Sequence, residues 1–322
     1  MKGCGNLLLS VLTLLTPLVA QPNRACTLEV PVGVVTSNAI LISGLTADSF
    51  VVSTSKTSIR VREAVYDSSA RRIVFAIDDR SHLNGPARTI MQAMIEKILA
   101  SHRAGDSFGI VFGDHPRIAI GDADAVRTAL RDSIAQKRSK NQSLLDTIAD
   151  GANLFGKSQP GDSVLVFAGD DRLNEGHENY RKLYDSLSER RIRVFGILFS
   201  FYFGGFGSIS RAALWTDMEI SPDEKTIHSL TWGSGGYYRQ ETTNDEGREY
   251  KLTNDRLRGV TTLALQMYGA IAEFYRLEID FPSSQPNIQN WKLGLSSNIA
   301  NNQNKHVLYP HQLPRCDTTN PQ

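Results

Sequence analysis

The sequence predicts an α/β fold: a doubly wound, mostly parallel sheet with helices on both faces. From residue 72 to about 276, short apolar runs alternate with longer segments of helical periodicity, the pattern of strands joined by crossover helices. Two apolar runs end abruptly in paired carboxylates. They are 73–77, followed by Asp78 and Asp79, and 164–168, followed after one glycine by Asp170 and Asp171. Parallel strands carry such groups to the carboxyl edge of the sheet, where folds of this kind place their sites.

The strands of this sheet are predicted from short runs rich in β-branched and aromatic residues, which are typical of buried strands. A shorter run, 117–120, is expected to form an edge strand. A final core strand is expected after the turn at Gly235 and Gly236. The remaining expected strands are 73–77, 107–112, 164–168 and 193–200.

The helices are predicted from apolar residues that recur at three- and four-residue spacing. The first follows Pro86, because proline fits the first turn of a helix. Another begins with Ser221, Pro222 and Glu224, which form a capping-box sequence. The other expected helices cover 126–134, 143–155, 180–187 and 255–275.

Both ends of the chain are expected to be strand-rich. Residues 27–70 and 277–316 show period-two alternation, interrupted by residues that favour turns. We expect the two segments to pack together as one small β subdomain beside an α/β domain at 71–276.

The N-terminus predicts export. A basic start precedes an apolar stretch at 7–20, which has the length of a signal-peptide core and is too short to span a bilayer. Residues 1–20 are therefore interpreted as a signal peptide, with a retained anchor as the alternative. The mature chain is expected to be secreted or to reside in the periplasm or envelope, with no membrane span. The net charge of +1 gives no field that would attract nucleic acid.

Cysteine usage agrees with export. Cys4 lies in the expected signal, which leaves Cys26 and Cys316 near the two ends of the mature chain. In an oxidising compartment, two such thiols favour one disulfide. The alternative is two unpaired cysteines.

Oxygen ligands at the carboxyl edge predict a metal site. Asp78, Asp79 and Asp170 follow strands, and Ser143 begins a helix that lies between them in the sequence. Carboxylate and hydroxyl oxygens from several loops suit Mg²⁺, which needs only one or two direct carboxylates. The alternative is that these groups cap helices and solvate loops.

The order of these segments resembles the von Willebrand factor A domain, and more closely a bacterial von Willebrand factor A-related family of exported proteins. The resemblance covers about 27–316 and implies a non-enzymatic, protein-binding domain. The matching segments are 73–78, 105–111, 143–146, 164–170 and 230–236 in the core, and 30–32, 42–50 and 306–310 in the flanks.

The resemblance also implies a metal-ion-dependent adhesion site, for which Asp78, Ser143 and Asp170 occupy matching positions. This sequence departs from the motif, because Arg80 and His82 stand where the family has two serines. A guanidinium has no lone pair for a metal. Shifting the register by one pairs Asp79 with Ser81 but leaves Leu83 in the last serine position. The resemblance therefore implies a degenerate site, for which Mg²⁺ is the expected cation.

The function expected from these observations is recognition of a protein partner at the carboxyl edge of the sheet. Arg80 and His82, together with Phe203 and Phe206 of an aromatic, glycine-rich segment, are the expected contact residues. Two alternatives stay open. One is a metal-dependent hydrolase in which His82 is the general base, and the other is a structural envelope component without a ligand.

Overall fold

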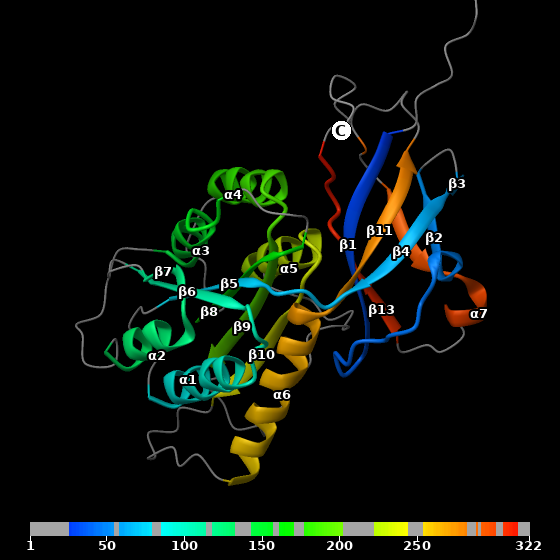
Figure 1. The fold of residues 1–322 in the computed structure, drawn as a ribbon. Coiled ribbons are helices and arrows are strands. Elements are labelled where there is room, and N and C mark those ends of the chain that lie inside the picture. The colour runs from blue at the N-terminus through cyan, green and yellow to red at the C-terminus, as the bar shows by residue number, and fades with distance from the viewer. Residues whose placement is uncertain are drawn as a thin grey trace, which may run out of the picture.

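The computed structural model forms two lobes that lie side by side, an α/β lobe and a β-sandwich (Figure 1). The residues that it describes are 26–54, 58–78, 85–113, 118–132, 143–156, 161–170, 177–201, 222–243, 254–281, 288, 291–300 and 305–314. The expected signal peptide lies outside these ranges. Among the helices within them, none is both long and apolar enough to cross a membrane.

The α/β lobe is built on a six-stranded sheet with the order β10-β9-β8-β5-β6-β7. Five strands pair in parallel, and only the edge strand β7 runs antiparallel to its neighbour. The chain moves outward from β5 in both directions, so the switch point lies between β5 and β8. The bounds are β5 Arg72–Ile77, β6 Ser107–Phe112, β7 Ile118–Gly121, β8 Ser163–Asp170, β9 Arg193–Phe201 and β10 Tyr238–Thr243.

Helices cover both faces of this sheet (Figure 1). Successive side chains of a strand point to opposite faces, and β5 follows this rule. Ile73 and Phe75 join a buried cluster with α1, α2 and α6, whereas Val74 and Ala76 join one with α3, α4 and α5. The bounds are α1 Gly85–Ala100, α2 Ala123–Asp132, α3 Leu144–Ala152, α4 His177–Glu189, α5 Pro222–Gly233 and α6 Asn254–Ala272. The doubly wound α/β fold predicted from the sequence is therefore correct.

Two of the predicted helices end earlier than expected: α3 ends at Ala152 rather than at residue 155, and α6 ends at Ala272 rather than at residue 275. The guanidinium of Arg193 donates hydrogen bonds to the carbonyl oxygens of Ala270 and Ile271, at 3.2 and 2.5 Å. A cation that binds the last carbonyls stabilises a helix C-terminus. Phe274 and Tyr275 consequently belong to the following strand, although their apolar character continues the helical pattern.

The second lobe is a sandwich of a four-stranded sheet, β13-β1-β11-β4, and a three-stranded sheet, β12-β2-β3. β1 from one end of the chain pairs with β11 and β13 from the other, so both ends build this subdomain. Its core includes Val32, Phe50, Tyr275 and Trp291. The bounds are β1 Cys26–Thr36, β2 Phe50–Ser53, β3 Ser58–Ile59, β4 Val61–Asp67, β11 Phe274–Phe281, β12 Lys292–Leu295 and β13 Lys305–Leu308, with short helices η1 Ala47–Ser49 and α7 Ser297–Ala300.

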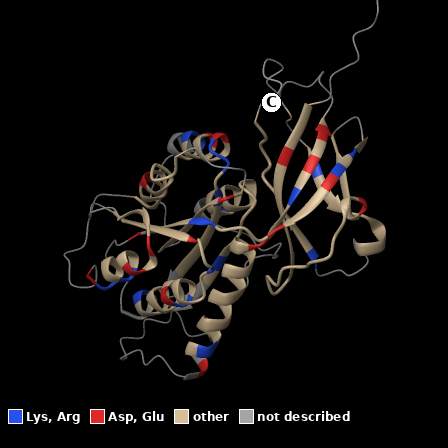
Figure 2. Ribbon diagram, viewed as in Figure 1, with Lys and Arg blue, Asp and Glu red and all other residues tan. Residues whose placement is uncertain are grey.

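A charged hub joins the two lobes. We define it as Asp67, Arg71, Asp162, Arg193 and Arg276. The guanidinium groups of its three arginines lie over the ring of Phe274. The guanidinium carbons of Arg71 and Arg193 lie 4.3 and 4.4 Å from the centre of that ring. Figure 2 shows acidic and basic positions side by side on the sandwich strands that lead to this junction. The hub therefore connects the start of β5 and β9 to the sandwich through buried charges.

Cys26 begins β1, and Cys316 lies beyond the described residues. Their disulfide stays a prediction.

The end of α4 carries a residue in an unfavourable backbone conformation. Arg191 has φ 56°, in the left-handed region that favours glycine. Backbone hydrogen bonds from Arg191 to Ser188 and from Ile192 to Leu187 close the helix there, as in a Schellman-type cap.

Replacing Arg191 by glycine is expected to raise the free energy of unfolding by about 1 kcal/mol, because it removes the strain of an L-residue at positive φ. Thermal unfolding followed by circular dichroism should show an increase in Tm of about 2 °C. The matched change Arg181→Gly, at an exposed position inside α4, should lower Tm instead, since glycine destabilises a helix interior. A fall in the Tm of Arg191→Gly would contradict this account.

Candidate functional site

Asp78 lies at the carboxyl end of β5 and is held against the neighbouring strand. Its backbone N–H donates a hydrogen bond to the carbonyl oxygen of Ala168 in β8, at 2.8 Å. The residue is only 2% exposed. β5 and β8 pair in parallel up to Ile77 and Ala168. The hydrogen bonds between these two strands therefore fix the position of Asp78 at the carboxyl edge of the sheet.

Ser143 is the N-cap of α3. Its backbone is extended, with φ −85° and ψ 164°, and its Oγ accepts a hydrogen bond from the N–H of Asp146 at 3.0 Å. This is the cap geometry that serine favours. A hydroxyl has one proton to donate and a second lone pair, so capping leaves Ser143 able to bind a ligand or a cation.

Gly169 allows these two elements to meet β8. A Cβ at this position would lie 3.0 Å from the Cβ of Asp78 and 3.1 Å from a methyl carbon of Leu144, the first residue of α3. Both distances are tighter than ordinary side-chain contacts, so the close approach depends on glycine. Asp170, the last residue of β8, follows directly. The structure thus brings together the three chain segments that carry Asp78, Ser143 and Asp170.

The remaining predicted site residues lie outside the described residues. They are Asp79, Arg80, Ser81, His82, Phe203 and Phe206, and their roles stay predictions. The side chain of Asp170 is likewise not described, although its backbone belongs to β8.

The donor atoms at this edge are of the type that binds a hard divalent cation. The described groups are the Asp78 carboxylate and the Ser143 hydroxyl, and both supply oxygen, the atom that Mg²⁺ prefers. Across the described ranges, no three His, Cys, Asp or Glu residues cluster in a way that could hold a metal. A cation at this edge would therefore depend on hydroxyl and water ligands as well as carboxylates.

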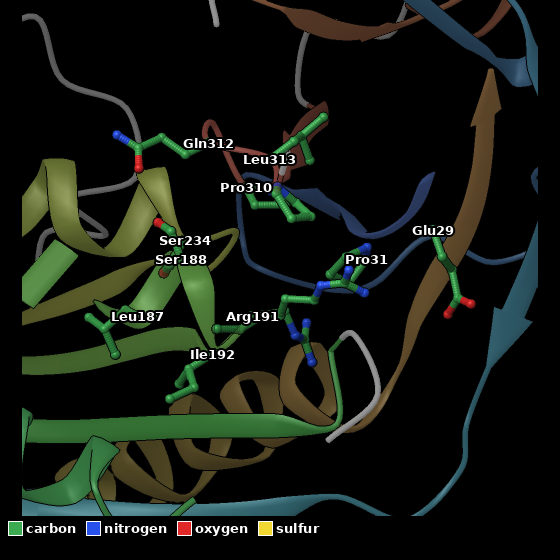
Figure 3. A pocket seen from close by; sticks show the side chains of 12 residues that line it. Glu29, Pro31, Leu187, Ser188, Arg191, Ile192, Ser234, Pro310, Gln312 and Leu313 are labelled. Atoms are coloured by element: carbon green, nitrogen blue, oxygen red, sulfur yellow. The ribbon is translucent and has the colours of Figure 1, made fainter. Parts of the chain in front are cut away.

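A second feature, which the sequence did not predict, is a small groove at the opposite, amino edge of the sheet. It has a volume of about 20 Å³ and lies where the corner between α4 and β9 faces β1 and the C-terminal segment. Figure 3 shows Arg191 and Ile192 on one side of the groove, with Pro31, Pro310 and Leu313 across from them. A positive φ at Arg191 cannot be read from a sequence, because arginine is rare in that conformation.

The fold and the site define a doubly wound α/β domain with an acidic residue at the switch-point edge, fused to a β-sandwich. No family model and no curated protein matches the sequence. Among solved structures, the chain is similar to an aerotolerance-related membrane protein from Bacteroides fragilis, with 14% identity, a TM-score of 0.40 and coverage of 62% of this chain and 100% of that one.

Two further solved structures show a similar degree of likeness. BatB from Bacteroides thetaiotaomicron has 13% identity and a TM-score of 0.39, over 62% of this chain and 98% of that one. A von Willebrand factor type A protein from Catenulispora acidiphila has 12% identity and a TM-score of 0.38, over 78% and 51%. These are the kinds of protein that the sequence resembles. Likeness at this level carries no argument about the site or its chemistry.

Proposed function

We propose that this chain is an exported protein-binding domain that engages a partner at the carboxyl edge of its six-stranded sheet. One observation carries the proposal: Asp78, the N-terminus of α3 at Ser143 and the end of β8 converge at the switch point. Ligands of doubly wound folds bind at this place, outside the carboxyl ends of the strands.

In this proposal, Asp78, Ser143 and Asp170 hold Mg²⁺. The cation supplies a positive charge that attracts an acidic side chain of the partner, and the surrounding loops supply specificity. The burial of Asp78 and the cap at Ser143 support a positioning role for these residues, because both are fixed by backbone hydrogen bonds before any ligand arrives.

Export belongs to the same proposal and rests on the apolar segment at 7–20. Intact mass spectrometry of the protein from its own cells should give a chain that begins near residue 21. A full-length mass would favour the retained anchor.

The metal part of the proposal predicts that the purified chain binds Mn²⁺, measured by electron paramagnetic resonance, and releases it to EDTA. Asp78→Asn keeps the shape of the side chain and should weaken Mn²⁺ binding by more than about tenfold, since even the loss of an outer-shell partner has that effect. Asp255→Asn, an exposed acid on α6, is the matched control and should bind like the wild type.

The binding function itself is tested by capture of proteins from an envelope extract of the producing cells on the immobilised chain. We expect a specific partner whose capture is lost in EDTA and with Asp78→Asn or Asp170→Ala. Capture that persists under all three conditions would contradict the metal-dependent form. Failure of the wild-type chain to capture any protein would contradict the binding function.

A further inference from the structure

The groove lies at the amino ends of the parallel strands, whereas Asp78 lies at their carboxyl ends. Arg193 begins β9 and Arg191 precedes it, so both mark the amino ends of the parallel strands. Across the groove, Pro31 comes from β1, and Pro310 and Leu313 come from the C-terminal segment. The two lobes therefore share this groove, and it is separate from the candidate site at the carboxyl edge.

Arg191 is the unusual residue of this groove. Its side chain is half-buried, and within the described part of the chain its guanidinium has no hydrogen bond or ion pair. Its neighbour Arg190, in contrast, donates hydrogen bonds to Ala152 and Asn153. Arg191 also occupies a backbone position that favours glycine. Strained residues are concentrated at functional sites, where the surrounding structure holds them in place.

The other charges of the groove are already occupied. Glu29 accepts a hydrogen bond from Arg276 at 2.7 Å, and the guanidinium of Arg193 binds the carbonyl oxygens at the end of α6. Hence the one carboxylate in the described lining pairs with a different arginine, and no carboxylate of that lining pairs with Arg191. A half-buried cation in such a setting favours an anionic partner.

Apolar side chains form half of the lining, beside the uncharged polar residues Ser188, Ser234 and Gln312. The apolar residues include Leu187, Ile192, Pro31, Pro310 and Leu313. The three prolines of the lining, which include Pro314, offer no N–H group, so recognition by this wall depends on apolar contact rather than on main-chain pairing.

From Arg191, which pairs with no described carboxylate, and the apolar walls, we propose that the mouth of this groove is a docking site for an acidic, extended segment of a partner protein. The segment lies across the opening, because the interior of about 20 Å³ holds about one water molecule. One carboxylate of the segment pairs with Arg191 through two parallel hydrogen bonds, and its aliphatic stem and flanking apolar residues contact the proline-lined wall. A single free guanidinium suits a single carboxylate, whereas a nucleic acid backbone requires several cations in a row. This contact needs no metal, in contrast to the proposed function at the opposite edge.

The test measures fluorescence polarisation of a labelled, terminally blocked nonapeptide, (Pro-Leu-Glu)₃, mixed with the full chain in EDTA, which excludes metal-dependent binding at the carboxyl edge. The control peptide has glutamine in place of each glutamate. Three proteins are compared: the wild type, Arg191→Gly, which we expect to be more stable, and Arg181→Gln, which removes an exposed charge from α4 outside the groove.

We expect the glutamate peptide to bind the wild type and Arg181→Gln equally, and Arg191→Gly about tenfold or more weakly, the effect of losing one charge-assisted contact. The glutamine peptide should bind all three proteins weakly. Equal affinity of wild type and Arg191→Gly, equal affinity for the two peptides, or no binding by the wild type would each overturn the proposal. None of these results depends on the metal site, so the two proposals fail separately.

Discussion

Replacing Asp67 by asparagine is expected to lower the free energy of unfolding by about 3–5 kcal/mol, the cost of removing one partner from a buried ion pair. Asp67 is 8% exposed, and Arg71, its partner at 3.1 Å, is 0% exposed. The asparagine side chain keeps the size but loses the charge. Among the described residues, Arg71 would then keep only the more exposed Asp162, at 3.5 Å, as a carboxylate partner.

The geometry of the hub explains why the loss is large. One carboxylate oxygen of Asp67 accepts hydrogen bonds from Ser69 and Arg71, and the other pairs with the Nε of Arg276. Few groups can replace these contacts, since Arg71 is fully buried between the two lobes. Arg276 also binds Glu29 and Asp162, so the disturbance reaches β1 and the turn before β8.

Urea denaturation of wild type and Asp67→Asn measures this effect directly. The matched control is Asp255→Asn, whose side chain is 85% exposed and whose ion pair with Arg258 lies on the surface of α6. Surface pairs contribute little to stability, so the control should unfold at the wild-type urea concentration. Equal midpoints for Asp67→Asn and the wild type would show that the hub does not hold the lobes together.

The hub also gives the stability a defined dependence on pH. Burial by itself would raise the pKa of Asp67, but hydrogen bonds from Ser69 and Arg276 outweigh it, and the pKa lies well below its ordinary value. A lowered pKa stabilises the folded state above the ordinary value of 3.8, and this stabilisation is lost as the pH falls below it toward the folded pKa. Asp67→Asn should therefore lose less stability than the wild type between neutral pH and pH 3.

The sequence was sufficient to predict the α/β fold because the buried strands have a local pattern. Apolar runs such as 73–77 and 164–168 end where the polar edge begins, and burial on both faces produces that pattern directly. The convergence of Asp78 and Ser143 at one edge followed from the same reasoning. The sequence predicted that the two ends of the chain pack together, but not that β1 pairs with β11, more than two hundred residues away. Alternating apolar and polar residues identify a strand but do not show which strand it pairs with.

The hub and the groove could not be predicted from the sequence. Arg71 and Arg193 stand just before or at the start of apolar strands, where exposed arginines are also common. Their burial depends on Phe274 and on carboxylates that are distant in the chain. The end of α6 was misplaced for a related reason, because the cap from Arg193 is a tertiary contact.

The segment 230–236, one of the motifs behind the family resemblance, has a physical explanation in the structure. It leaves α5 and passes between the start of β9 and the C-terminal segment, where Ser234 pairs with Pro310 in a β-bridge. The N–H of Val194 donates a hydrogen bond to the Oγ of Ser234 at 2.9 Å. Gly236 follows with its backbone directly against β9, so that a Cβ there would overlap the carbonyl oxygen of Val194.

Gly236→Ala is accordingly expected to lower the free energy of unfolding by at least about 3 kcal/mol, since a backbone carbonyl in a buried strand cannot move aside as a flexible side chain can. Gly259→Ala is the matched control. It lies on the exposed part of α6 with no atom within 4 Å of the added Cβ, and alanine should stabilise that helix by about 1 kcal/mol. Thermal unfolding of the two variants should therefore shift in opposite directions. If Gly236→Ala unfolds at the wild-type temperature, the segment that follows α5 does not approach β9 as closely as this packing requires.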